Sequence, residues 1–121
     1  MTMTVDVVIA GATCAALSAA IDAASQDKRV LVVAAARGTD LRRRVRRARR
    51  IAGAARSKQI CVLTGAEIEC VGGLRSVEAV LIRYTGTSRR VDVNTSALLT
   101  FEETEINDRN HRGGSNGCRV C

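Results

Sequence analysis

A single glycine between two apolar runs is the feature that most constrains the fold of this chain. Residues 7–20 read VVIAGATCAALSAA, with a β-branched block before Gly11 and an alanine-rich segment from Cys14 onward. A short apolar run that ends at a glycine is typical of a strand buried on both faces in a parallel sheet. We therefore predict a strand over 5–10, a tight turn, and a helix over 14–25.

The alternation of strands and helices continues to residue 63. Two further buried strands are predicted over 29–33 and 59–63, and the first strand, helix and second strand form a βαβ unit with a right-handed crossover. Between the second and third strands, an amphipathic helix is expected over 41–56. Its N-cap lies within Gly38, Thr39 and Asp40, and its apolar stripe recurs at steps of three and four residues: Leu41, Val45, Ala48, Ala52 and Ala55.

After residue 66 the pattern changes from continuous apolar runs to alternation. The segments 67–71, 77–84 and 91–93 alternate apolar with polar residues and are separated by turn-forming breaks, which predicts a three-stranded antiparallel meander. Residues 97–101 are apolar again and predict a last strand that returns to the parallel sheet. The prediction is one α/β domain over 1–101, followed by a polar and flexible tail over 102–121.

This order of elements resembles the FAD/NAD(P)-binding domains of two-dinucleotide flavoproteins. Thioredoxin reductases and related FAD-dependent oxidoreductases belong to that group. The resemblance covers roughly residues 4–101, and the phrases VLTGAEI at 62–68 and VEAVLIR at 77–83 are similar to the meander of these proteins. It implies a Rossmann-like three-layer fold, with a parallel sheet and an antiparallel three-stranded β-meander. It also implies binding of an adenine dinucleotide, either FAD or NADP.

The resemblance places the cofactor at the turn after the first strand and at the end of the second. The turn residues are Gly11, Ala12, Thr13, Cys14 and Ala15, and the second strand ends at Ala34 and Ala35, with Arg37 following. The family fingerprint has three glycines, and here Gly11, Thr13 and Ala16 stand in their places. The β-branched Thr13 occupies space that phosphate oxygens need, although its hydroxyl can donate a hydrogen bond instead. No carboxylate follows the second strand, and Arg37 does. This combination is compatible with the 2′-phosphate of NADP.

The cysteines and the single histidine form no convincing catalytic or metal-binding set. Cys118 and Cys121 form a CxxC pair, the spacing of a redox dithiol, and they are the only weak catalytic candidates. His111 lies upstream of that pair, but the sequence does not supply the four ligands of a zinc site and we predict no metal site. Five cysteines without a secretory signal or a membrane-length apolar run indicate a cytoplasmic protein that does not contact a membrane.

The basic charge of the chain is confined to one segment. The net charge is +7, but residues 37–58 alone carry +9. Such a helix can contact nucleic acid or an acidic partner, or it can be a solvated face. Only Tyr84 and Phe101 are aromatic, which leaves little ring area for stacking on bases.

We therefore expect a dinucleotide-binding domain of flavoprotein-oxidoreductase type that is incomplete as an enzyme by itself. Hydride transfer in such proteins needs a second domain, so this chain would act with a second subunit or as a homo-oligomer, or it is a fragment or a degenerate relative. The alternative is a non-enzymatic interaction module that binds nucleic acid or an acidic partner through the arginine-rich helix 41–56. Whether the chain is an enzyme is left open by the sequence.

Overall fold

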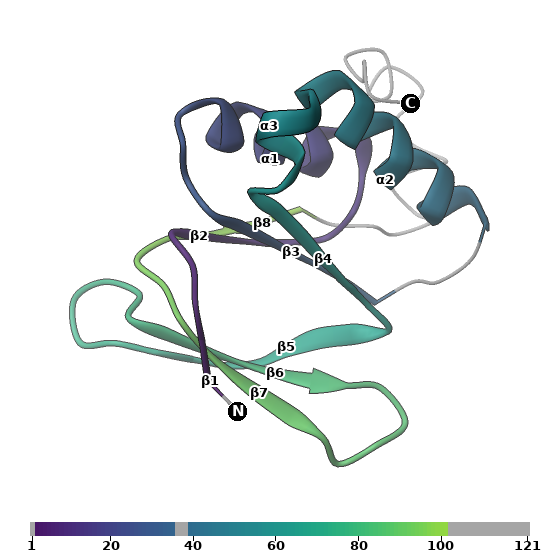
Figure 1. Ribbon diagram of the computed structural model, residues 1–121. Coiled ribbons are helices and arrows are strands. Elements are labelled where there is room, and N and C mark those ends of the chain that lie inside the picture. Colours follow the sequence, from purple (N-terminus) through teal and green to yellow (C-terminus); the bar gives the residue numbers. More distant parts are fainter. Residues whose placement is uncertain (1, 36–38, 102–121) are drawn as a thin grey trace, which may run out of the picture.

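A computed structural model describes residues 2–35 and 39–101, which form two sheets and a layer of helices (Figure 1). The elements, in chain order, are β1 (Thr2–Thr4), β2 (Val7–Ala10), α1 (Cys14–Ser25), β3 (Val30–Ala34), α2 (Thr39–Ala52), α3 (Ala54–Ser57), β4 (Ile60–Thr64), β5 (Ala66–Gly72), β6 (Ala79–Tyr84), β7 (Arg90–Asn94) and β8 (Leu98–Thr100). The helix predicted over 14–25 is confirmed with the same bounds.

Four parallel strands form the central sheet, in the order β4-β3-β2-β8. The last strand pairs with β2, with Val8 opposite Leu98, so the predicted return of the chain to the parallel sheet is confirmed. The carboxyl ends of the four strands lie at one edge, because Ala10 is opposite both Val33 and Thr100, and Ala34 is opposite Thr64.

The second sheet contains the predicted meander and one strand that the sequence did not reveal. Its order is β1-β7-β6-β5, in which β5, β6 and β7 are antiparallel and β1 is parallel to β7. The single strand predicted over 5–10 was therefore wrong at its start. The chain leaves one sheet and enters the other at Val5 and Asp6: the Val5 N–H donates to Asn94 O, whereas the Asp6 and Val7 N–H groups donate to Arg29 O.

The three layers follow from the alternation of side chains along the parallel strands. Helices α1, α2 and α3 lie on one face of the parallel sheet and the meander sheet lies on the other (Figure 1). Along β3, which is buried throughout, Val30, Val32 and Ala34 belong to the core beneath the helices, and Leu31 and Val33 belong to the core against the meander. The Rossmann-like three-layer fold expected from the sequence is confirmed.

The arginine-rich helix predicted over 41–56 is divided into two helices. The first, α2, already begins at Thr39, so Asp40 lies inside its first turn, near the positive end of the helix dipole. The second, α3, begins after Gly53, whose φ of +91° lies outside the range of a right-handed helix. Ala55 is therefore exposed on α3 and does not continue the buried stripe of α2.

No helix in residues 2–35 and 39–101 has the length and apolarity that crossing a bilayer requires.

Candidate functional site

The turn after β2 is built around Gly11, which lies between two neighbouring strands. Its N–H donates to Val33 O over 2.7 Å, and the Phe101 N–H donates to Ala10 O over 2.8 Å, so the end of β8 runs alongside the turn. Gly11 has a φ of +112°, and a Cβ placed on it would lie 2.3 Å from Phe101 O. Both the backbone angle and the close approach require glycine, which accounts for the first position of the fingerprint.

Thr13 begins α1 as its N-cap. Its backbone is extended, its Oγ1 accepts a hydrogen bond from the Ala16 N–H at 3.1 Å, and its carbonyl accepts from the Leu17 N–H. The amide groups of a first helical turn have no acceptor within the helix, and a threonine at the N-cap satisfies one of them. The Thr13 hydroxyl oxygen therefore caps helix α1 as an acceptor, whereas the sequence predicted the hydroxyl only as a donor to a phosphate.

Arg44 is a site residue that the sequence analysis missed. It lies on α2, and its Nη1 donates a hydrogen bond to Ala12 O at 3.1 Å, although the two residues are 32 positions apart. Helix α2 packs against α1, and this packing places a partly buried guanidinium beside the turn at the start of α1. No sequence signal distinguishes Arg44 from the neighbouring arginines, because only the packing of α2 against α1 shows which of them reaches the turn.

The structure brings most of the predicted cofactor-binding residues to one edge of the parallel sheet. Gly11, Ala12, Thr13, Cys14 and Ala15 form the turn and the start of α1, and Ala34 and Ala35 lie at the end of β3. Ala12 and Ala34 are fully buried, whereas Ala15 and Ala35 are exposed. Arg37 lies outside the described residues. In open parallel sheets, ligands bind outside the carboxyl ends of the strands, which is where this turn lies.

The remaining candidates lie away from this edge or outside the described residues. Cys118, Cys121 and His111 belong to 102–121, which the structure does not describe. Cys61 and Cys70 are exposed free thiols on β4 and β5. Within the described part of the chain, no group of three or more histidine, cysteine, aspartate or glutamate side chains could hold a metal ion.

No protein-family model matches the sequence, and no curated protein is significantly similar to it. Solved structures do resemble it. Thioredoxin reductase from Streptococcus pyogenes superposes with a TM-score of 0.60 at 16% identity, over 84% of this chain and 32% of that one. An oxidoreductase from Agrobacterium tumefaciens superposes with a TM-score of 0.55 at 24% identity, over 81% and 36%. A geranylgeranyl bacteriochlorophyll reductase-like protein from Thermoplasma acidophilum gives 0.61 at 14% identity, over 100% and 44%.

These likenesses concern the fold and only a part of each neighbour. The chain spans about a third of the length of the thioredoxin reductases it matches. At such low identity the superposition carries no residue roles from one protein to the other. The described residues share the Rossmann-like fold of these thioredoxin reductases, which is the fold that the sequence resemblance implied.

Proposed function

We propose that this chain is a dinucleotide-binding domain of flavoprotein-oxidoreductase type, and that it binds FAD or NADP(H) at the turn from Gly11 to Ala15. The observation that carries the proposal is the position of this turn. It joins the central parallel strand β2 to the start of a twelve-residue helix, at the carboxyl edge of the sheet. The likeness in fold to thioredoxin reductases supports the same proposal.

The residues at the turn suit a pyrophosphate in two respects. The first-turn amides and the dipole of α1 favour an anion at its N-terminus. The guanidinium of Arg44 adds a full positive charge, already oriented by its hydrogen bond to Ala12 O. Thr13 weakens the backbone contribution compared with the glycine of the family fingerprint. Its side chain fills space that phosphate oxygens would need, and its Oγ1 already accepts the hydrogen bond of the Ala16 N–H. The charge of Arg44 would compensate for part of that weaker backbone interaction.

The end of β3 bears on which dinucleotide is bound. NAD and FAD sites use a carboxylate there for the ribose hydroxyl groups, and Ala34 and Ala35 provide none. Arg37 follows in the sequence and has the charge that a 2′-phosphate requires. The end of β3 therefore favours NADP(H), whereas FAD is a candidate from the sequence resemblance alone, and binding measurements distinguish the two.

Catalysis requires more than this domain. A bound dinucleotide would supply hydride chemistry, and this chain's contribution would be to hold and orient it. The chain covers only 32% of the length of these thioredoxin reductases, so a second domain or subunit would have to provide the other reactant. We also propose a cytoplasmic location for the protein.

The test is a thermal-shift and calorimetry series with FAD, FMN, NAD⁺, NADH, NADP⁺ and NADPH. A ligand present at about 100 times its Kd should stabilise the fold by about 2.7 kcal/mol. We expect one or more adenine dinucleotides to raise the Tm and FMN, which lacks the pyrophosphate, to leave it unchanged. FAD and NADP(H) are distinguished directly by which of them acts.

Ala15→Asp is the variant that separates binding from folding. A carboxylate in the first turn of α1 favours the helix dipole, so stability should be unchanged or slightly raised, while repulsion of the phosphates should abolish the ligand-induced shift. Ala15 is exposed, and Ala15→Asn is the matched neutral control that should retain binding. Absence of any shift with every dinucleotide, or an equal shift in Ala15→Asp, would contradict the proposal.

A further inference from the structure

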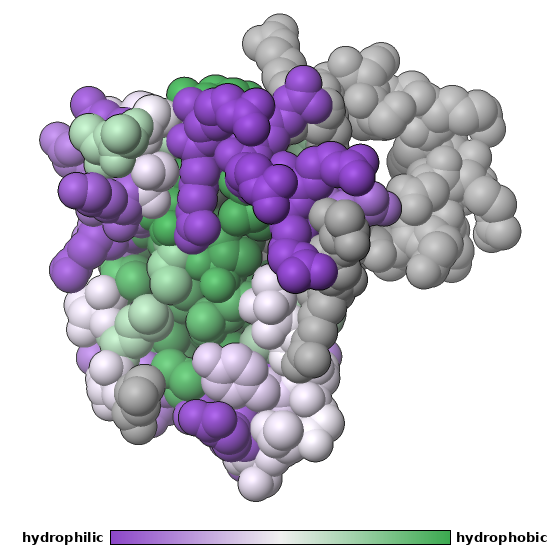
Figure 2. Space-filling model, turned by 45° about the vertical axis from the view of Figure 1, so that its right-hand side comes forward, coloured by the Kyte–Doolittle hydropathy of each residue, from purple (hydrophilic) through white to green (hydrophobic). Residues whose placement is uncertain are grey.

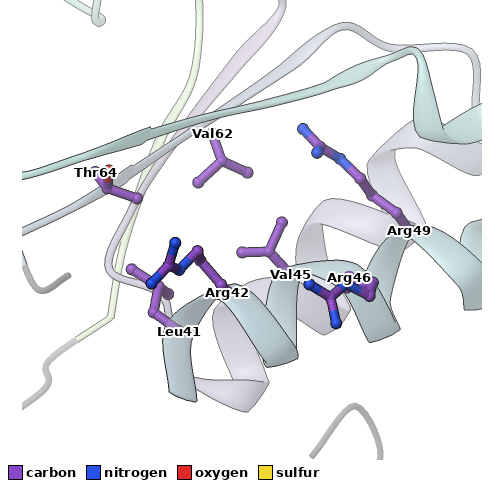
Figure 3. A pocket seen from close by; sticks show the side chains of 7 residues that line it. All are labelled: Leu41, Arg42, Val45, Arg46, Arg49, Val62 and Thr64. Carbon is purple, nitrogen blue, oxygen red and sulfur yellow. The ribbon is translucent and has the colours of Figure 1, made fainter. Parts of the chain in front are cut away.

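A groove lies between α2 and the edge strand β4, away from the turn that the proposed function uses. It has a volume of about 360 Å³, and its lining is Leu41, Arg42, Val45, Arg46, Arg49, Val62 and Thr64 (Figure 3). The aliphatic side chains form its floor and the three arginines stand along the helix side. On the face shown in Figure 2, apolar atoms lie exposed beneath a row of hydrophilic side chains. This volume is at the low end of the range for ligand pockets, and the groove is open along one side. It therefore suits a peptide that lies along it better than a small molecule that must be enclosed.

The groove borders the edge of the parallel sheet at β4. In the parallel sheet, β4 pairs with β3 on one side and with no described strand on the other. The Gln59 carbonyl accepts from Val30 N–H, so the backbone groups of alternate residues, beginning with Ile60, point away from β3. Arg49 Nη2 donates to Ile60 O at 3.2 Å and covers that end of the edge. The outward groups of Val62 and Thr64 lie beside the groove, where an added strand would pair with them.

The spacing of the arginines matches an added strand with acidic residues on one face. Arg42 and Arg49 are about 10 Å apart along the axis of α2, at about 1.5 Å per residue, and Arg46 lies between them. Alternate residues of a strand are about 6.6 Å apart and point to the same side, so two residues that flank a central one on that side are about 13 Å apart, which the long arginine side chains can span. A segment with glutamates flanking a central valine at alternate positions would place the valine on Val45 and Val62 and both carboxylates near guanidinium groups. This pattern reads the same in both directions, so strand polarity does not affect the match.

Two other occupants fit less well. A second copy of this chain would bring another segment of charge +9 against the first, because residues 37–58 carry that charge in each copy. A nucleic acid would satisfy the arginines but would leave the aliphatic floor and the outward backbone groups of β4 without partners.

We propose that this groove binds an acidic, extended peptide segment of a partner protein, which adds as a fifth strand to β4. Main-chain hydrogen bonds to Val62 and Thr64 align the segment along β4, and the arginines on α2 select its charge. This inference does not depend on the dinucleotide, because its residues are distinct from those of the Gly11 turn.

The test is fluorescence anisotropy with the full chain and a fluorescein-labelled seven-residue peptide. The peptide has glutamate at its second and sixth positions, valine at the fourth and threonine elsewhere. We expect saturable binding at low salt that weakens as salt is raised. The Arg42→Glu, Arg46→Glu double variant should weaken binding at least about tenfold, whereas charge reversal at the exposed turn residue Arg75, away from the groove, should change it less than about twofold.

A second peptide separates strand addition from simple charge attraction. N-methylation of alternate amides, on the side that faces β4, keeps the charges but removes the main-chain donors, and we expect it to abolish binding. Equal binding of this peptide, or an equal loss in Arg75→Glu, would overturn the proposal. A 20-base-pair DNA duplex that binds more tightly and competes with the peptide would overturn it in favour of nucleic acid, and a groove-dependent dimer in sedimentation would do so in favour of a second copy.

Discussion

Gly11 lies where two strands leave room for a hydrogen atom and no more. A methyl group there would lie 2.3 Å from Phe101 O, and the φ of +112° already disfavours a side chain. We expect Gly11→Ala to lower the free energy of unfolding by at least about 2 kcal/mol, because the clash with backbone adds to the cost of the backbone angle. Urea unfolding measures the effect.

Gly86 is the matched control for this substitution. It also has a positive φ, of +79°, but nothing lies within 4 Å of a Cβ built on it. Gly86→Ala should therefore cost only about 1 kcal/mol, the penalty of the left-handed backbone alone. Equal losses of stability at the two positions would show that the approach of Phe101 does not govern the turn.

Glu69 lies in an ion-pair ladder on the meander, and its titration reports on that ladder. Hydrogen bonds from Arg90 lower the pKa of Glu69 below its ordinary value of 4.5, with the charges of Arg90 and Arg83 adding to the effect and desolvation opposing it. A lowered pKa in the folded state means that the stabilisation is present above pH 4.5 and is lost as the pH falls through the folded pKa.

Arg90→Gln should therefore raise the pKa of Glu69 toward 4.5, as followed by NMR of the side-chain carboxyl carbon. The stability difference between the wild type and Glu69→Gln should shrink on acidification below that range. Arg75→Gln, an exposed turn residue, is the control and should leave the titration in place. An unchanged pKa in Arg90→Gln would show that the hydrogen bonds at 2.6 and 3.1 Å are not maintained in solution.

At the scale of elements, Arg44 joins α2 to the turn before α1. Its hydrogen bond to Ala12 O is partly buried, and bonds from charged donors are worth more than neutral ones. We expect Arg44→Met to destabilise the protein by about 1 kcal/mol and to speed amide exchange around the turn. The adjacent exposed residue provides the comparison: Arg43→Met should have little effect on either measurement. Equal effects would mean that the arginines of α2 act only through their total charge.

Elements defined by local pattern were predictable, and those defined by distant partners were not. Helix α1 has the predicted bounds because Thr13 caps it and a polar break follows it. The short β1 was missed because Thr2 and Thr4 are polar and exposed, and its place depends on β7, about 90 residues away. The break at Gly53 was missed because a lone glycine is tolerated in many helices, and only its backbone angle shows that this one ends α2.

The candidate site divides in the same way. The turn and the helix start could be placed from the residues around Gly11, since a glycine after a buried strand has few alternatives. Arg44 and the groove along β4 could not be placed, because both depend on how α2 packs against α1 and on which strand lies at the edge of the sheet. Such packing between distant segments leaves no periodic trace in the sequence.

At the scale of the whole molecule, two apolar cores share one sheet. The central strand β3 contributes Val30 and Val32 to the core beneath the helices, and Leu31 and Val33 to the core against the meander. Its backbone cannot be released on one face while it remains ordered on the other. The helices and the meander should therefore unfold together, although the parallel sheet separates them.

The chain offers a separate probe for each layer. Tyr84, at the end of β6, is the only tyrosine and there is no tryptophan, so tyrosine fluorescence reports on the meander. Circular dichroism at 222 nm reports mainly on α1 and α2, in the opposite layer. We expect the two urea transitions to coincide. Leu17→Ala lies in the helix-side core and Leu31→Ala in the meander-side core. Each should lower the free energy of unfolding by about 2–5 kcal/mol and move both urea transitions to the same lower midpoint. If Leu17→Ala shifted only the dichroism and Leu31→Ala only the fluorescence, the layers would be independent and the sheet would not couple them.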